Sequence, residues 1–354
     1  MTRILLFGTY DPWYSRNRVI TKGLKSAGFD VAECHDKFSI FGLFRLAAGL
    51  IKRRKNFDIL FVLFPGQEVM LIARLFTSRP IVFDAFTSHY EGYVLDRKKY
   101  KPGSMRAKWY RLIDRVSCAL ADVVLLDTNA HVEFFVRQFG LQRKKFRVVY
   151  VGTDDDVFVP RENSKPHKRF LVHFHGHYIP LHGARYIIEA ASMIKGRGIH
   201  FRMIGKGQEY DIMRKLAHEL NADNITFIGN VPYDDLPKYI AEADVCLGIF
   251  GDTPKTGVVI PNKVFESIAC ARPVITADTP AIREMFHDGH DIIFVPAANA
   301  NALATAILRL RDDEELRKSI AHGGHELFAH YFTRTHISSV LKDIVYNIQN
   351  HAKH

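Results

Sequence analysis

The chain has little cysteine and no long apolar run. Its 354 residues include four cysteines, Cys34, Cys118, Cys246 and Cys270, and no two of them form a CxxC pair. This usage argues against a disulfide framework or a zinc site and for a reducing compartment. No apolar run reaches the roughly 18 residues that cross a membrane. The first residues, MTRILLFGTYDPW, have too short an apolar core for a signal peptide, so we expect a first strand there and a cytoplasmic protein.

Acidic residues are scarce in the first half of the chain. Residues 1–160 hold 26 Lys and Arg against 16 Asp and Glu, whereas residues 161–354 hold 23 against 22. Nearly all of the net charge of +11 therefore belongs to the first half. A basic half beside a neutral half predicts an anionic partner for one domain, and nucleic acid, phosphorylated substrates and anionic lipid all qualify.

Short apolar runs alternate with helical stretches along the chain. The runs are 3–8, 57–64, 79–86 and 121–127, then 170–176, 200–205, 224–229, 243–250, 272–277 and 291–296. This rhythm predicts an α/β fold of two doubly wound, Rossmann-like domains. We place them at 1–160 and 161–325, with the polar stretch 158–169 as linker and helices in 326–354 crossing back to the first domain. Such domains bind ligands in the cleft between them, at the carboxyl ends of the strands.

The stretch 260–276, IPNKVFESIACARPVIT, runs from a loop through a helix to a strand. Pro261 and Asn262 are typical helix-start residues, and Glu266 follows one turn later. The amino end of a helix suits a diphosphate, Lys263 could reinforce that contact, and Glu266 could accept hydrogen bonds from ribose hydroxyls. A surface acid favoured by the helix dipole is the alternative for Glu266.

Four stretches of the second half resemble glycosyltransferase family 4, a retaining family with the GT-B fold. GHYIPLHG (176–183) with its following helix resembles the family's GRxxxxKG stretch, and 201–217 resembles its G-x-G turn, at Gly205 and Lys206. Residues 225–250 resemble the segment that contacts the nucleotide base, around Gly229 to Val231. Residues 260–276 match the helix that carries the ribose-binding glutamate, at Glu266. The resemblance covers 170–325 well and 1–160 only in strand order.

The departures from the family pattern concern charge. The family often has a second glutamate eight residues earlier, where this chain has Val258, and Pro261, Lys263 and Glu266 fit a branch with the pattern P-x-K-x-x-E. His177 and His182 replace the Arg and Lys that neutralise the departing diphosphate, and a histidine with an ordinary pKa near ~6.5 is mostly neutral at pH 7.

Three interpretations of His177 and His182 remain open. A bound diphosphate could raise the pKa of both, so that they act as cations. Lys206, Lys255 or Lys263 could supply the charge instead, with the histidines only donating hydrogen bonds. Donor binding could also have been lost or altered.

In the first half, Gly8 ends the first strand, where a GT-B enzyme brings backbone close to the donor. The usual paired glycines are absent. Asp84 and His89 follow a strand at the place where the family keeps a polar residue near the donor sugar, and a capping Asp with a surface His is the alternative.

Two basic segments could face the acceptor. Residues 38–57 are interpreted as a buried crossover helix with a basic end. Residues 96–115 mix Lys and Arg with Tyr100, Trp109 and Tyr110, which suits an anionic membrane surface and also single-stranded nucleic acid, or a plain solvated face.

The resemblance implies a glycosyltransferase that uses a nucleotide-sugar donor and a glycan or lipid-linked acceptor of the cell envelope, at the inner face of the membrane. Nucleic acid is the less favoured partner. Because no acidic cluster indicates a metal, we expect no cofactor besides the nucleotide-sugar co-substrate. His177, His182 and Lys263 would stabilise the leaving diphosphate. The alternatives are a sugar-nucleotide epimerase or phosphorylase on the same fold, and a catalytically silent GT-B module that binds membrane or nucleic acid.

Overall fold

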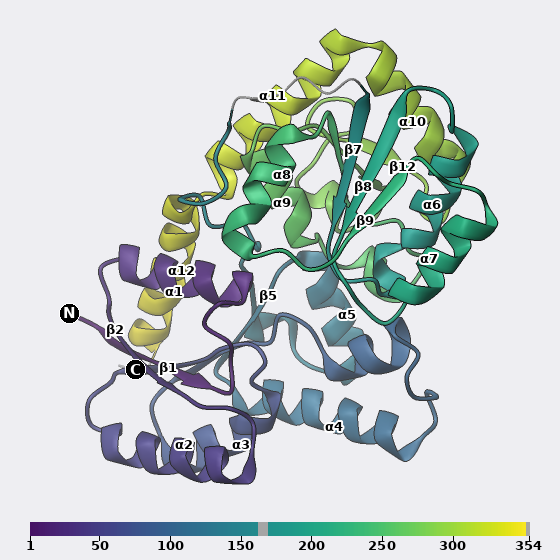
Figure 1. Ribbon diagram of the computed structural model, residues 1–354. Helices are drawn as coiled ribbons and strands as arrows, with labels where there is room; N and C mark the ends of the chain where they lie inside the picture. The colour runs from purple at the N-terminus through teal and green to yellow at the C-terminus, as the bar shows by residue number, and fades with distance from the viewer. Residues whose placement is uncertain (162–168, 352–354) are drawn as a thin grey trace. The chain divides into compact units, whose positions relative to one another are not determined.

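Two six-stranded parallel sheets, each with helices on both faces, organise the chain in the computed structural model (Figure 1). The structure describes residues 1–161 and 169–351. The chain divides into unit 1, Met1–Gly152 with Thr333–His354, and unit 2, Thr153–Phe332. The predicted α/β class with two doubly wound sheets is confirmed.

The sheet of unit 1 has the order β2-β1-β3-β4-β5-β6. Its strands are β1 (Arg3–Gly8), β2 (Asp30–His35), β3 (Ile59–Val62), β4 (Ile81–Asp84), β5 (Val123–Leu126) and β6 (Phe146–Val148). The apolar runs did not predict β2 and β6. Both lie at the edges of the sheet, and β2 has no fully buried residue, so its sequence DVAECH lacks an apolar run.

Helices cover the two faces of this sheet with separate apolar cores. One core joins Phe7, Leu60 and Phe83 to α2 (Ile40–Arg53), α3 (Met70–Phe76), α4 (Met105–Leu120) and α5 (Asn129–Phe139). The other joins Leu6 and Phe61 to α1 (Ser15–Ser26) and α12 (Arg334–His351). Alternate residues of one strand thus face opposite cores, as the period of a strand requires.

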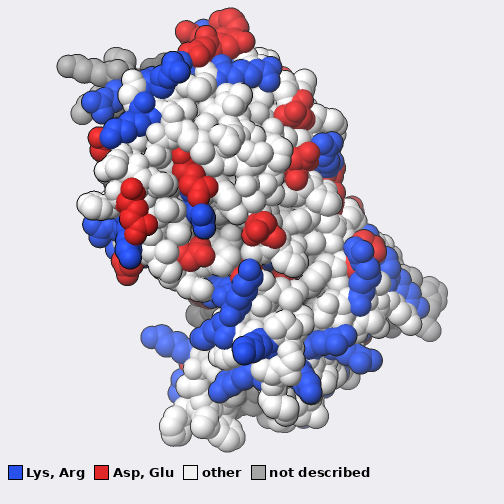
Figure 2. All heavy atoms as spheres, turned by 90° about the vertical axis from the view of Figure 1, so that its right-hand side faces the viewer, with Lys and Arg blue, Asp and Glu red and all other residues white. Residues whose placement is uncertain are grey.

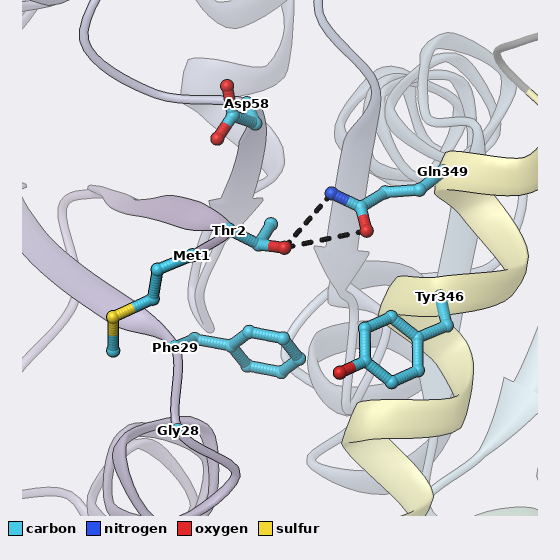
Figure 3. Close-up of a pocket in the computed structure, with 7 residues that line it drawn as sticks. All are labelled: Met1, Thr2, Gly28, Phe29, Asp58, Tyr346 and Gln349. Atoms are coloured by element: carbon cyan, nitrogen blue, oxygen red, sulfur yellow. Dashed lines mark hydrogen bonds between the residues drawn. The ribbon is translucent and has the colours of Figure 1, made fainter.

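The C-terminal helix α12 packs beside α1 in unit 1 (Figure 1). Nε2 of Gln349 donates to Oγ1 of Thr2 over 3.1 Å. A hollow of 410 Å³ lies beside this contact, lined by Met1, Thr2, Gly28, Phe29, Asp58, Tyr346 and Gln349 (Figure 3). It adjoins the amino end of β1, whereas Gly8 and Asp84 stand at the carboxyl ends of their strands.

The sheet of unit 2 has the order β12-β11-β10-β7-β8-β9. The strands are β7 (Phe170–His175), β8 (Ile199–Ile204), β9 (Ile225–Ile228), β10 (Val245–Leu247), β11 (Val274–Ala277) and β12 (Ile293–Val295). The helices are α6 (Ala184–Met193), α7 (Tyr210–Glu219), α8 (Leu236–Glu242), α9 (Asn262–Ala269), α10 (Ala300–Asp312) and α11 (Glu314–Tyr331). All six strands predicted in this half are present.

The unit boundaries differ from the predicted ones by a few residues. Unit 2 begins at Thr153, because residues expected at the start of the linker already pack into it: Phe158 is buried and its ring lies edge-on to Tyr233. Residues 162–168 of the predicted linker lie outside the described residues. The chain returns to unit 1 at Thr333, so α11 stays with unit 2 and α12 alone crosses back.

Candidate functional site

The strand order of unit 2 reverses at β7, with β8 and β9 on one side and β10, β11 and β12 on the other. In doubly wound sheets, ligands bind at such a switch point, beyond the carboxyl ends of the strands. Residues 176–183, with the two histidines singled out from the sequence, directly follow β7. The topology therefore places them where a ligand is expected.

Two glycines bring three chain segments together at this point. A Cβ added to Gly176, which has φ of +143°, would lie 3.1 Å from Nζ of Lys263 and from Cε1 of His182. A Cβ added to Gly205, which has φ of +127°, would lie 2.0 Å from the carbonyl oxygen of Gly176. Because neither position has room for a side chain, the ends of β7 and β8 and the start of α9 approach closely.

Helix α9 begins where the sequence predicts it. Pro261 is the N-cap, with extended backbone at φ −73° and ψ 148°, and no side-chain hydrogen bond caps the helix. The first turn therefore presents backbone N–H groups and partial positive charge. Lys263 and Glu266 are 4% exposed each, so both ionisable side chains of this stretch are buried.

Lys263 is an amine held in an apolar environment. Its Nζ lies 4.9 Å from the centre of the Phe174 ring, and among the described residues it has no hydrogen-bond partner. Burial lowers the pKa of Lys263 to about 7, although the charge of Glu266 acts in the opposite direction. The ammonium and the free amine are therefore both populated near neutral pH, and an anionic ligand would favour the ammonium.

His182 is neutral in this structure. Its Nδ1–H donates to the backbone carbonyl of His177, which leaves the lone pair on Nε2. Burial, and then the charge of Lys263, lower the pKa of His182 well below its usual value. His177 itself is exposed. The geometry thus argues against His182 as a cation and favours a lysine as the source of positive charge.

Glu266 accepts a hydrogen bond from a histidine that the sequence reasoning missed. Nε2 of His175 lies 2.8 Å from Oε2 of Glu266. His173, two residues earlier on β7, contacts His175, and Arg202 of β8 contacts His173. The sequence feature that could have revealed these residues is the pair of histidines at alternate positions in the apolar strand FLVHFH. Alternate positions of a strand lie on one face of the sheet.

The remaining predicted donor contacts of unit 2 lie in the segments that follow β8, β9 and β10. Nζ of Lys206 stands 3.7 Å above the Tyr210 ring, and a Cβ at Gly229 would lie 3.7 Å from Cε of Lys206. Val231 follows in the loop and is half-buried, and Lys255 lies in the 3-10 segment Pro254–Gly257. The roles of these residues toward a nucleotide stay predictions.

In unit 1, the predicted sugar contact by Asp84 needs a correction. Asp84 ends β4, but its carboxylate is fully buried against Arg16, whose Nη2 lies 2.9 Å from Oδ1. Arg16 also donates through Nη1 to the carbonyl oxygen of Val149 over 2.6 Å. Asp84 is thus a partner in an internal ion pair, and its oxygens are not presented to a ligand.

His89 and Gly8 lie at the same edge of the sheet. Nε2 of His89 lies 2.7 Å from Oε1 of Glu68, and its backbone N–H donates to Asp114. Burial lowers the pKa of His89, but the hydrogen bond and charge of Glu68 outweigh it, so the pKa is raised. Gly8 ends β1 as predicted. Sugar contact by His89 stays a prediction.

The same unit holds a second buried cluster, which the sequence did not reveal. His131 lies 2.6 Å from Asp127 and 3.1 Å from Glu91, and all three are buried. Burial lowers the pKa of His131, but the two carboxylates outweigh it and raise the pKa to about 9. The imidazole is therefore a cation at neutral pH that holds β5, α5 and the segment after β4 together.

Acidic side chains gather at one place in the described part of the chain. Asp154, Asp155 and Asp156 each bring a carboxylate oxygen to within 4.8 Å of the others. They are consecutive residues in a turn, which is closed by hydrogen bonds from the backbone N–H groups of Val157 and Phe158 to the carbonyl oxygen of Asp154. Neighbouring positions in a turn account for this proximity, and the absence of a metal cofactor remains a prediction.

Comparison with known proteins relates part of unit 2 to a described family. Residues 168–313 match the family model for glycosyl transferases group 1. The match lies within unit 2. The lipopolysaccharide core biosynthesis glycosyltransferase LpsE of Rhizobium meliloti is 27% identical over 200 residues, 55% of this chain and 56% of its own. The alpha-D-kanosaminyltransferase of Streptomyces kanamyceticus is 26% identical over 234 residues, 62% of this chain and 58% of its own. The chain thus spans little more than half the length of these relatives.

Solved structures match the whole chain. Sucrose-phosphate synthase from Thermosynechococcus elongatus superposes with a TM-score of 0.79 at 16% identity, over 99% of this chain and 100% of that one. HepE from Anabaena, in complex with UDP and glucose, superposes with a TM-score of 0.76 at 15% identity, over 98% and 100%. These likenesses show the GT-B fold for both units of the chain.

Proposed function

We propose that the protein is a retaining glycosyltransferase of family 4 that takes a sugar from a nucleotide-diphosphate donor. The observation that carries the proposal is the pair of buried ionisable residues, Lys263 and Glu266, in the first turns of α9. Among the described residues the amine of Lys263 has no hydrogen-bond partner, and a buried amine of this kind beside a helix amino end fits a diphosphate. A buried carboxylate one turn away fits ribose hydroxyls. The group 1 match covers these residues.

The geometry supports a role for each of these residues. The ammonium of Lys263 and the N–H groups of α9 stabilise the diphosphate as its charge grows in the transition state. Neutral His182, with its lone pair on Nε2, accepts a hydrogen bond from a hydroxyl of the donor sugar rather than pairing with phosphate. His177 is exposed and reaches the leaving group as a hydrogen-bond donor. Glu266 binds the ribose, and the loop at Gly229 to Val231 contacts the base.

Nucleotide binding tests the proposal. The melting temperature is measured with UDP, GDP, ADP and CMP and with their common sugar conjugates, on the wild type, Glu266→Ala and the control Glu219→Ala, an exposed glutamate of α7. A ligand at 100 times its Kd adds about 2.7 kcal/mol, or several degrees. We expect a shift with one base that Glu219→Ala keeps and Glu266→Ala loses. No shift with any nucleotide would contradict the proposal and favour the catalytically silent module.

The acceptor side of the proposal is a lipid-linked or cell-envelope glycan at the cytoplasmic face of the membrane. A relative named for lipopolysaccharide core biosynthesis supports the class of acceptor. None of the helices among the described residues is long and apolar enough to cross a bilayer. We propose that a surface of unit 1 makes the contact with the membrane.

Two helices of unit 1 carry an apolar stripe on their outer side. On α2, Phe41 and Phe44 are 75% and 70% exposed, while Leu46 and Leu50 of the same helix are buried in the core. The prediction of a buried crossover helix with a basic end therefore holds for one face of α2 and is wrong for the other. On α4, the exposed apolar side chains are Met105, Trp109, Leu112 and Val116, and α3 lies in contact with both helices.

Basic side chains accompany these stripes. Lys52 and Arg53 end α2, and α4 carries Arg106, Lys108, Arg111 and Arg115. On the face of unit 1 that is turned to the viewer in Figure 2, Lys and Arg are spread widely and few Asp and Glu are seen. An apolar stripe rimmed by cations suits the headgroup layer of an anionic membrane, where each basic residue adds about 1 kcal/mol. The apolar stripe favours lipid over nucleic acid, which would not cover Phe41 and Phe44.

Co-sedimentation with vesicles tests the membrane surface. We expect binding to vesicles that contain phosphatidylglycerol and weaker binding to vesicles of pure phosphatidylcholine. The double variant Phe41→Ser/Phe44→Ser should lose at least about tenfold in affinity, because burying each phenyl ring in the membrane contributes roughly 2 kcal/mol to the free energy of binding. Ile212→Ser, an exposed apolar residue of α7 in unit 2, is the matched control. Equal binding of the double variant, or no preference for anionic lipid, would contradict this part of the proposal.

A further inference from the structure

Strand β7 carries two buried histidines on the face opposite its apolar residues. Val172 and Phe174 belong to the main core of unit 2. His173 and His175 point to the other face and are 0% and 6% exposed. Burying an imidazole ring costs free energy unless the ring is hydrogen-bonded, and apolar side chains at these two positions would avoid that cost. Packing alone therefore does not explain why two histidines occupy this face.

The two histidines link an arginine to Glu266 through consecutive hydrogen bonds. Arg202 of β8 lies opposite His173 in the sheet register. Its Nη1 lies 2.5 Å from Oε2 of Glu242 in α8. Its Nε lies 3.4 Å from Nδ1 of His173. Nε2 of His173 lies 3.0 Å from Nδ1 of His175, whose Nε2 lies 2.8 Å from Glu266. These hydrogen bonds form a row of side chains that runs from Glu242 in α8 through Arg202, His173 and His175 to Glu266 in α9.

The direction of every hydrogen bond in this row follows from Arg202. A guanidinium only donates, so Nδ1 of His173 accepts and its proton lies on Nε2. His175 then accepts at Nδ1 and also carries its proton on Nε2, which is donated to Glu266. A second proton on His175 would place two N–H groups face to face with His173. The row thus keeps both imidazoles neutral and Glu266 an ionised acceptor.

We propose that Arg202 and His173 are positioning residues that act through His175 to hold the Glu266 carboxylate as an oriented acceptor for the ribose hydroxyls of the donor. This inference rests on the proposed function. Within the described residues, His175 supplies the one side-chain hydrogen bond that Glu266 accepts, so Oε1 remains for the ribose. Burial lowers the pKa of His173 well below its usual value, and the charge of Arg202 acts in the same direction, which accords with a neutral ring.

The tautomers can be observed without any ligand. In protein labelled with ¹⁵N in its histidine rings, long-range proton–nitrogen correlations distinguish a proton on Nε2 from one on Nδ1. His173→Gln and His175→Gln assign the two signals. We expect both rings to be neutral with the proton on Nε2 at pH 7, and Arg202→Met to let a fraction of His173 carry it on Nδ1. A proton on Nδ1 of either ring in the wild type would overturn the inference.

The functional readout is the preference for ribose. Affinities are measured for the nucleoside diphosphate that binds best and for its 2′,3′-dideoxy counterpart. We expect His175→Leu to bind the ribonucleotide about tenfold more weakly, as hydrogen bonds to charged groups imply, and the dideoxynucleotide within about twofold of wild type. Arg202→Met should show a smaller loss of the same selectivity. His175→Gln should retain most of the preference, because its amide can donate to Glu266.

The outcomes separate this inference from the proposed function. Equal weakening of both nucleotides in His175→Leu would mean general damage to the fold and would overturn the inference alone. An unchanged ribose preference in that variant would do the same. Failure of the wild type to bind any nucleotide would overturn the proposed function and the inference with it.

Discussion

Replacing Lys263 with Met is expected to stabilise the unliganded protein and to abolish its response to nucleotide. The pKa of Lys263 is about 7 in the folded chain, against an ordinary value of 10.5. Burying this ionisable amine therefore lowers the free energy of unfolding at pH 7 by roughly 2–4 kcal/mol, and a methionine would not cause this loss. We expect the melting temperature to rise by several degrees, while the shift produced by the cognate nucleoside diphosphate disappears.

The pH dependence of this effect has a fixed sign. Because the folded-state pKa lies below the unfolded value, the destabilisation is fully present below pH 7 and fades as the pH rises towards 10.5. The advantage of Lys263→Met is thus greatest at low pH. Nucleotide affinity of the wild type should fall about tenfold between pH 6 and pH 8, as the ammonium of the free protein is lost.

Lys215→Met is the matched control, because Lys215 is an exposed lysine of α7. Its melting temperature and its nucleotide shift should stay close to those of the wild type. A Lys263→Met variant that still binds nucleotide with unchanged affinity would contradict the assignment of Lys263 to the diphosphate. A variant that melts below the wild type would contradict the lowered pKa of the buried amine.

Replacing Arg16 with Met is expected to destabilise unit 1 strongly. The side chains of Arg16 and Asp84 are both 0% exposed. Removing the guanidinium would leave the carboxylate buried without its cation, and the carbonyl oxygen of Val149 without its donor. Breaking a buried ion pair in this way costs about 3–5 kcal/mol, which lowers the melting temperature by roughly 10 °C.

The double variant Arg16→Met/Asp84→Leu separates charge from packing. An apolar pair of similar volume often replaces a buried ion pair without loss of stability. We expect calorimetry to show that the double variant recovers most of the loss seen in Arg16→Met. If Arg16→Met melts within about 2 °C of the wild type, Asp84 is not held by this pair and could be free to contact a sugar.

Much of the fold could be predicted from the sequence because buried parallel strands are apolar throughout. The strands that were not predicted, β2 and β6, lie at the edges of their sheet. An edge strand has a neighbouring strand on one side only, so fewer of its side chains need to be apolar. The return of the chain to unit 1 was anticipated, but its position at Thr333 depends on which side chains α11 and α12 bury, and that requires the tertiary structure.

The position of the candidate site could be predicted from the sequence, but the charge states of its side chains could not. The helix start at Pro261 placed Lys263 and Glu266 together from spacing alone. The neutral state of His182 depends on burial and on a carbonyl oxygen of the same turn, which no residue pattern reveals. His173 and His175 were visible in the sequence, but they stood in a run taken as purely apolar. Asp84 was misinterpreted because its partner, Arg16, lies 68 residues earlier.

Crystals soaked with the nucleoside diphosphate that shifts the melting temperature would test the central claim most directly. The account predicts difference density at the amino end of α9, with the diphosphate at Lys263 and its ribose hydroxyls within hydrogen-bonding distance of the Glu266 carboxylate. Density for the nucleotide elsewhere on the chain, or none at a concentration that saturates binding in solution, would contradict it.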